Sequence, residues 1–233
     1  ALEPYIPPTQ KGIFAFGNVQ PNGVSMSNLV NSSGVIAADV TGVGTARFQL
    51  GAATYGGDKA IFAYGTTTGG SYLSVSNLVS NSGVVDTTGV GTGRYNLGAA
   101  KYGVGLAIMA FGHDGSSVAN YKNLINSSGV VASDASSTGH ARSRISAVGY
   151  GTDKAIFFGG HSATYSSGTT ISNLCSNTGV VASDTANSSG VTARYELAGT
   201  SYGVGLAIFA YGSTDSNVSM SNKVSISGVI AAD

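Results

Sequence analysis

The hexapeptide AIFAYG at residues 60–65 occurs again at residues 207–212, and close variants of it occur at three more places. The variants are GIFAFG (12–17), AIMAFG (107–112) and AIFFGG (155–160). The isoleucines of the five copies are 48, 47, 48 and 52 residues apart. A period of this length predicts repeated supersecondary units that bury their cores against one another.

Two further motifs recur with the same period. A segment of the type SNLVNSSGV occurs five times, and an arginine opens a segment of the type RFQLGAATYG four times. The asparagines are Asn28, Asn77, Asn123, Asn173 and Asn222, and the arginines are Arg47, Arg94, Arg142 and Arg194. The chain therefore reads as one domain, 1–233, with five repeats at approximately 1–46, 47–93, 94–141, 142–193 and 194–233.

Each repeat reads as four short strands, which we call a, b, c and d in chain order. Their types are RFQLGAATY, KAIFAYG, VSMSNLV and VIAAD. Strand c alternates with period two, and the NSSG after it is a turn sequence whose Asn and Gly accept positive φ. No helical period of adequate length appears. Four strands in a unit of about 48 residues predict an all-β fold, a single five-bladed β-propeller.

An arginine before strand a, followed by an aromatic and apolar strand b that ends in glycine, resembles the kelch repeat. AIFFGG at 155–160 has the diglycine of that family, and the other four copies keep only its second glycine. The Trp of kelch strand d is missing from every copy. The repeats are also similar to arrays in predicted virion proteins of bacteriophages. The resemblance implies a kelch-like propeller, and the small residues of strand a suit a narrow ring of five.

Composition excludes several function classes. Charged residues make up 9% of the chain against a usual ~25%, and the net charge is zero without a basic cluster, which argues against nucleic-acid binding. No apolar run approaches the ~20 residues that span a bilayer, so we expect no membrane insertion. Cys175 is the only cysteine, so an intrachain disulfide framework is excluded. We expect this cysteine to be buried. Residues 1–10 lack a signal-peptide pattern, and we expect an irregular segment that covers an edge.

Spacing locates the variable surface. The distance from motif arginine to isoleucine is always 14 residues, and that from motif asparagine to turn glycine is always 6. All variation in length falls in the b–c and d–a loops, which leave the same face of an up-and-down unit and form the expected binding surface. The expected ligand-binding residues of this face are Tyr72, His113, Asp114, Tyr121, His161, Tyr165 and Asp215, and a d–a loop adds His140.

Two chemical hypotheses compete with simple binding. His113 and His161 occupy the same position in neighbouring repeats, and Asp114 is adjacent, but zinc needs about three convergent ligands and exposed loop histidines are the alternative. Propeller hydrolases need paired carboxylates or clustered arginines. The recurring carboxylates are Asp39, Asp86, Asp134, Asp184 and Asp233. Because they and the motif arginines recur in nearly every repeat, we interpret both sets as structural. We expect no catalytic residue, metal or cofactor.

These observations favour a non-catalytic binding or structural module that is extracellular or part of a virion, as a tail-fibre or decoration protein. Aromatic rings flanked by Asn, Ser and Asp suit sugars, so the expected partner is a surface glycan or a protein, together with other virion or assembly subunits. The alternatives are a lectin-like or scaffold propeller of a cellular organism and, third, a propeller hydrolase or oxidase.

Overall fold

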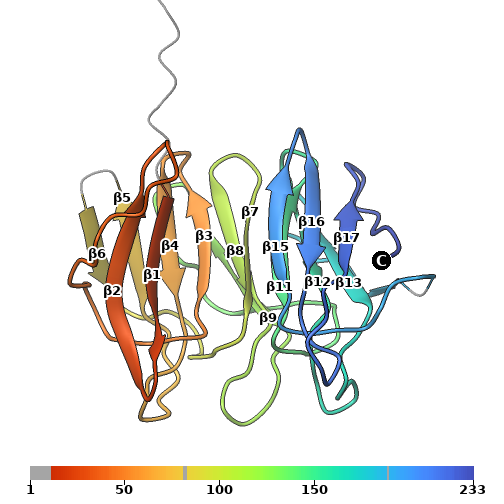
Figure 1. Ribbon diagram of the computed structural model, residues 1–233, viewed down its shortest axis with the longest axis horizontal. Coiled ribbons are helices and arrows are strands. Elements are labelled where there is room, and N and C mark those ends of the chain that lie inside the picture. The colour runs from red at the N-terminus through yellow and green to blue at the C-terminus, as the bar shows by residue number, and fades with distance from the viewer. Residues whose placement is uncertain (1–11, 81–82, 188) are drawn as a thin grey trace, which may run out of the picture.

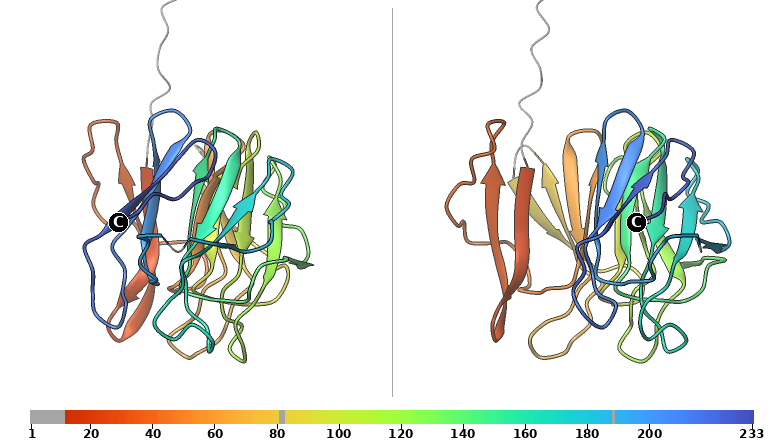
Figure 2. Two further views of the ribbon diagram at one scale, coloured as in Figure 1. Left: turned by 90° about the vertical axis from the view of Figure 1, so that its right-hand side faces the viewer. Right: turned by 45° about the vertical axis from the view of Figure 1, so that its right-hand side comes forward.

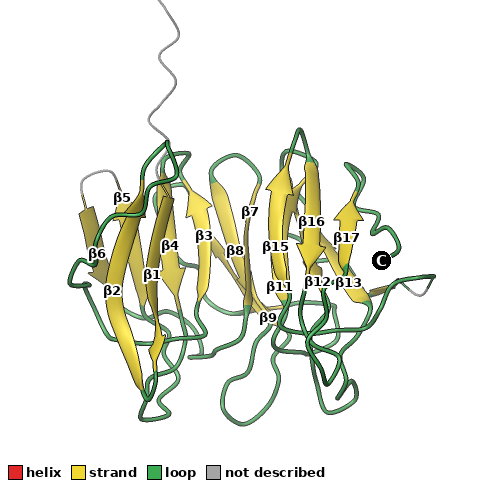
Figure 3. Ribbon diagram, viewed as in Figure 1, coloured by secondary structure: helices red, strands yellow, loops and turns green. Residues whose placement is uncertain are grey.

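The chain folds into antiparallel β-sheets that follow one another in the order of the repeats, and its described part contains no helix (Figures 1 and 3). This computed structural model describes residues 12–80, 83–187 and 189–233. The expectation of an all-β fold is confirmed. The irregular segment expected at residues 1–10 lies outside the described residues.

Five sheets can be distinguished, and we number them in chain order. The first pairs β1 (Gly12–Val19) with β2 (Asn22–Val30); the second contains β3 (Gly51–Tyr55), β4 (Lys59–Ala63), β5 (Ser76–Ser80) and β6 (Gly83–Thr87). The third contains β7 (Gly98–Tyr102), β8 (Leu106–Ala110), β9 (Tyr121–Ile125) and β10 (Ala135–Ser136); the fourth contains β11 (Ser146–Tyr150), β12 (Lys154–Phe158), β13 (Ile171–Cys175) and β14 (Thr185–Ala186). The fifth contains β15 (Ala198–Tyr202), β16 (Leu206–Ala210) and β17 (Ser221–Val224).

The AIFAYG motif forms a central strand in the second to fifth sheets. In the fourth sheet, β12 pairs with β11 on one side and with β13 on the other, in registers that set Ile156 opposite Val148 and Leu174. Residues 155–158 are buried, as expected for a β-favouring segment that is covered on both faces. The antiparallel strands of the five sheets lie roughly along a common axis. The connecting loops therefore gather at two opposite ends of the molecule (Figure 2).

The predicted strand d is shorter than expected. In most repeats the VIAA-type segment forms a single bridge to the preceding strand, as in Ile125 with Val131, and β10 and β14 are two residues long. The side chain of the motif asparagine explains this difference, because the Asn123 amide donates to Ala132 O and takes a carbonyl that a further ladder bond would use. Within the described residues, the first sheet has two strands and the fifth has three, and the strand a expected in the first repeat lies outside the described residues.

Three hydrophobic clusters lie between sheets rather than within them. They join the second sheet to the third, the third to the fourth, and the fourth to the fifth. Strand a approaches the following sheet closely: a Cβ on Gly98 would lie 2.8 Å from the Phe157 ring and 3.2 Å from Ala147. The small residues that the sequence places in strand a are therefore required by the neighbouring sheet.

The first sheet differs from the three that follow it. None of its residues is buried, and Phe14 and Leu29 are exposed. Residues 18–23, predicted to form a loop, instead continue the two strands, with Asn18 opposite Gly23 and a two-residue turn between Val19 and Asn22. A two-stranded hairpin, which is all that the described residues show of this sheet, buries little. Its contacts with the second sheet include the Phe16 ring, which lies 5.7 Å from that of Phe62, and the bond from Gly17 N–H to Arg47 O.

Candidate binding face

The motif arginines are fully buried and are bound by their own sheets. In the third sheet, Arg94 donates from Nε to Phe111 O (2.9 Å) and from Nη2 to Asn123 Oδ1 (2.6 Å). The Asn123 amide in turn donates to Asp134 Oδ1 at 2.8 Å. Arg47, Arg142 and Arg194 make the corresponding bonds to Asn77, Asn173 and Asn222. We call this repeated set of bonds the arginine network.

The carboxylate at the end of the arginine network accepts hydrogen bonds from the incoming chain. Asp134 Oδ2 accepts from the backbone N–H (2.9 Å) and the hydroxyl (2.7 Å) of Thr92, two residues before Arg94. Partial burial alone would raise the pKa of Asp134, but the hydrogen bonds from Asn123 and Thr92 outweigh it and lower that pKa. Asp184 and Asp233 accept the backbone N–H groups of His140 and Thr192 in the same way. These carboxylates are occupied by the fold.

Burial weakens the charge of a motif arginine without removing it at neutral pH. Burial lowers the pKa of Arg142 to about 10, and Asp184 acts in the opposite direction. Its guanidinium donates to Gly159 O (2.8 Å), His140 O (3.0 Å) and Asn173. A cation held by three acceptors inside its own sheet has a structural role, and it has no free face for a ligand.

A line of polar side chains crosses four sheets at the end of the molecule that holds the b–c loops, which we call the loop face. The line consists of the residues two positions after each motif arginine, Gln49, Asn96, Arg144 and Glu196, with φ of 57°, 54°, 53° and 56°. Backbone bonds join neighbours along it: Asn96 N–H donates to Gln49 O (2.9 Å), Arg144 N–H to Asn96 O (2.8 Å) and Glu196 N–H to Arg144 O (2.9 Å). Positive φ is uncommon for residues other than glycine, and here the ladder of backbone bonds holds all four residues in the same conformation.

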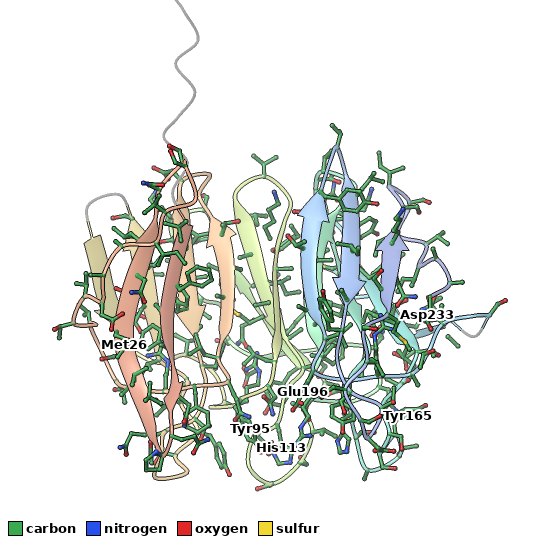
Figure 4. The ribbon with its side chains drawn as sticks, in the orientation of Figure 1. Met26, Tyr95, His113, Tyr165, Glu196 and Asp233 are labelled. Atoms are coloured by element: carbon green, nitrogen blue, oxygen red, sulfur yellow. The ribbon has the colours of Figure 1, made fainter. Side chains whose placement is uncertain are left out.

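Tyr72, Tyr95 and His113 form an aromatic row on the loop face. The rings of Tyr72 and Tyr95 are stacked, with centroids 5.2 Å apart and an interplanar angle of 14°, and the His113 ring lies 5.4 Å from that of Tyr95. Tyr72 comes from the second sheet and crosses to the third, where a Cβ on Gly115 would lie 2.0 Å from its ring. Two backbone bonds between Tyr95 and His113 hold the row in place. Figure 4 shows Tyr95 and His113 side by side at the lower end of the molecule.

A second cluster lies on the fourth and fifth sheets. The His161 ring meets the Tyr195 ring edge-on at 5.5 Å, and the Arg144 guanidinium lies 5.5 Å from the same Tyr195 ring. Arg144 Nε is 3.5 Å from Glu196 Oε1, and both side chains are about half exposed. The cluster therefore presents one cation, one anion and an aromatic ring together.

Asp114 and Tyr121 are also brought together. The Tyr121 hydroxyl donates to Asp114 Oδ2 at 3.3 Å, and Asp114 Oδ1 accepts the N–H groups of Ser116 and Ser117. Burial alone would raise the pKa of Asp114, and these hydrogen bonds outweigh it and lower that pKa. The pair orders the b–c loop of the third sheet.

Tyr165 and Asp215 belong to the remaining loops. The Tyr165 ring meets the His140 ring edge-on at 5.0 Å, and Asp215 Oδ2 accepts a hydrogen bond from the Ser167 hydroxyl at 2.9 Å. The expected ligand-binding residues thus form several pairs along the loop face rather than one cluster, and no contact joins His113 to His161 among the described residues.

Metal and thiol chemistry find no assembled site in the described part of the chain. No group of three or more His, Cys, Asp or Glu residues there has the arrangement of a metal site. Cys175 is buried, and burial raises the pKa of its thiol to about 12, so it is an apolar core residue. No helix in the described ranges has the length and hydrophobicity of a membrane-spanning segment.

Two tyrosines of the loop face, Tyr95 and Tyr195, are not among the expected ligand-binding residues. They directly follow Arg94 and Arg194, so the sequence pattern predicts them in strand a, whereas β7 and β15 begin later. The sequence signal for them is their position directly after a motif arginine. In the structure this position forms a backbone bridge with the residue after the strand-b glycine, where His113 and His161 lie. Comparison with models of protein families and with curated proteins finds no match for this chain.

Proposed function

We propose that the protein is a non-catalytic binding module that recognises a surface glycan or a protein through its loop face. The five sheets act in this proposal as blades of a kelch-like β-propeller, whose ends carry the loops. The proposed setting is extracellular, on a virion surface or fibre together with other assembly subunits, and it depends on the resemblance of the repeats alone.

The stacked row of Tyr72, Tyr95 and His113 is the observation that carries the proposal. Tyr72 is 41% exposed, and ring contacts hold the three side chains in place. Their hydroxyl and imidazole groups take no part in the arginine network. Aromatic faces stack on the apolar faces of sugars, and neighbouring polar groups bond sugar hydroxyls. Asn96 lies next to Tyr95 in the chain and supplies an amide at this place.

The engagement of the recurring carboxylates supports binding without catalysis. The carboxylates that recur in the repeats and lie within the described side chains are engaged by asparagine amides or backbone N–H groups, so they are not available as an acid and base pair. A prearranged surface loses little conformational entropy when a partner binds. A polar ligand of moderate affinity fits these properties.

A glycan array probed with the purified chain tests the proposal. Tyr72→Ala and Tyr95→Ala are expected to weaken binding of any recognised glycan at least about tenfold, because each removes a stacking partner. The control is Tyr202→Ala, which removes a 38% exposed tyrosine at the opposite end of β15 and should leave binding unchanged. Equal binding by all three variants would show that the loop face is not the recognition surface.

A further inference from the structure

Successive sheets are connected by one joint that is built four times. In each joint the motif arginine of one sheet lies over an aromatic ring of the preceding sheet, and its carbonyl accepts the N–H of the glycine that ends strand b there. The guanidinium-to-ring distances are 4.0 Å (Arg47 to Phe16), 4.1 Å (Arg94 to Tyr64), 4.5 Å (Arg142 to Phe111) and 5.5 Å (Arg194 to Phe158). The N–H donors are Gly17, Gly65, Gly112 and Gly160, at 2.8–3.0 Å.

In each joint the preceding sheet supplies the aromatic ring and the glycine N–H, which we call the receiving half. The backbone of this half has an unusual conformation. The last two residues of the strand-b motif have positive φ, for example 67° at Tyr64 with 102° at Gly65, and 63° at Phe111 with 107° at Gly112. In the fourth sheet Gly159 takes the first position, and the ring of Phe158, one residue earlier, lies near the arginine instead. A side chain in this conformation is strained, and its contact with the arginine compensates for that strain.

The fifth sheet carries the same receiving half, and nothing in the described chain fills it. Tyr211 has φ of 61° and Gly212 has φ of 106°, which match Phe111 and Gly112. Tyr64 and Phe111 are fully buried beneath their arginines, whereas Tyr211 is 63% exposed. No hydrogen bond from the Gly212 N–H and no guanidinium over the Tyr211 ring occur among the described residues.

The inner strand of the fifth sheet is uncovered in the same way. β7 and β11 are mostly buried and β3 is buried at both ends, because the following sheet packs against them, whereas β15 is exposed along its whole length. Among the described strands, β1 does not pack on β15 as β7 packs on β3. The fifth sheet therefore presents a continuous open face, which we define as β15 with Tyr211 and Gly212.

The open face lacks the motif arginine that completes the other joints, so its partner must supply an arginine that is not already engaged. Arg47, Arg94, Arg142 and Arg194 are fully buried in their own sheets, and Arg144 pairs with Glu196 on the loop face. The sequence before residue 47 contains no arginine, so the first sheet, of this or a second copy, brings none to the open face.

We infer that the open face binds a further repeat of the same pattern, with its arginine over Tyr211 and its arginine carbonyl on the Gly212 N–H. In the four existing joints the arginine follows the aspartate of the preceding repeat by 8, 8, 8 and 10 residues. Asp233 accepts hydrogen bonds from Thr192 and Asn222 as Asp134 does from Thr92 and Asn123, so an arginine 8 to 10 residues beyond Asp233 would lie at the same distance from the open face as in the existing joints. The surface is the next position of an established interface.

Amide hydrogen exchange tests this inference, first on the chain itself. The Gly212 N–H is expected to exchange at least about 100-fold faster than the Gly112 N–H, because only the latter is covered by a joint. Slow exchange at Gly212 would overturn the inference, since another part of the chain or a second copy would already cover the face.

The second measurement uses the chain extended by a copy of residues 185–233 placed directly after Asp233. Protection of Gly212 should then rise to that of Gly112, and it should be lost again when the arginine in the added copy is replaced by methionine. Tyr211→Ala should lower the midpoint of thermal unfolding more in the extended chain than in the original chain. If Gly212 stays unprotected while amides of the added strands are protected, the added repeat folds without docking and the inference is wrong.

Discussion

In four of the five repeats the arginine network and the loop face lie within a few residues of each other, yet their side chains differ in how strictly they recur. In the network, the same residue types recur and make the same bonds, and their polar groups are engaged by the fold, as with Arg142 and Asn173. On the loop face, the equivalent positions carry Gln49, Asn96, Arg144 and Glu196, which share a backbone conformation but carry two amides, a cation and an anion. The contrast indicates that the backbone of this face is fixed by the fold while its side chains vary from repeat to repeat, as the proposed binding role requires.

Replacing one arginine of the network and one of the loop face tests this difference with the largest expected effect. Arg142→Met is expected to cost about 3–5 kcal/mol of the free energy of unfolding, because it leaves the buried acceptors on Gly159, His140 and Asn173 without a donor. Arg144→Met, two residues later, changes a side chain that is 40% exposed and should cost less than about 0.5 kcal/mol. Urea denaturation followed by circular dichroism measures both, and equal losses would refute the division between network and face.

Much of the arginine network could be foreseen from the sequence. The period of the isoleucines, the constant spacing from arginine to isoleucine and the recurrence of asparagine and aspartate all indicated a structural set. What pattern alone could not show was the partner of each group. Strand d forms over five residues in the second repeat, as β6, and is shorter than predicted in the others, where, as in the third repeat, the Asn123 side chain bonds Ala132 O.

The loop face was foreseen only in outline. Loop lengths indicated which end varies, and Tyr72 and His113 were expected there. The stacking of Tyr72 on Tyr95 was not predicted, because it joins two repeats and depends on how far the sheets rotate relative to each other. The positive φ at Gln49 and Asn96 has no sequence signature, since it is imposed by the ladder of backbone bonds between sheets and not by residue type.

The stability of the two regions should also depend differently on pH. The pKa values of Asp134 and Asp233 are lowered in the folded chain, so their contribution to stability is present above the unfolded value of 3.8 and is lost as pH falls through the lower folded values. The Asp134→Asn variant should therefore be less stable than the parent at pH 7, and the difference should shrink as the pH falls below about 4. Asp215→Asn on the loop face, where the carboxylate is exposed and bonded only to Ser167, is the control and should track the parent in urea midpoints from pH 7 to 2. A pH-independent deficit in Asp134→Asn would mean that its charge is not what the network uses.

The smallest expected effect concerns the one ion pair of the line of polar side chains. Arg144 Nε and Glu196 Oε1 are 3.5 Å apart, but the two side chains are 40% and 52% exposed, so water and salt screen their attraction. Glu196→Gln should cost no more than about 0.5 kcal/mol at low salt, and the loss should disappear at about 0.5 M salt in thermal unfolding. The ladder bond from Glu196 N–H to Arg144 O does not depend on the side chain and is retained in this variant. A larger loss that resists salt would show that the pair holds adjacent sheets together, and the line would then belong with the arginine network instead of the recognition surface.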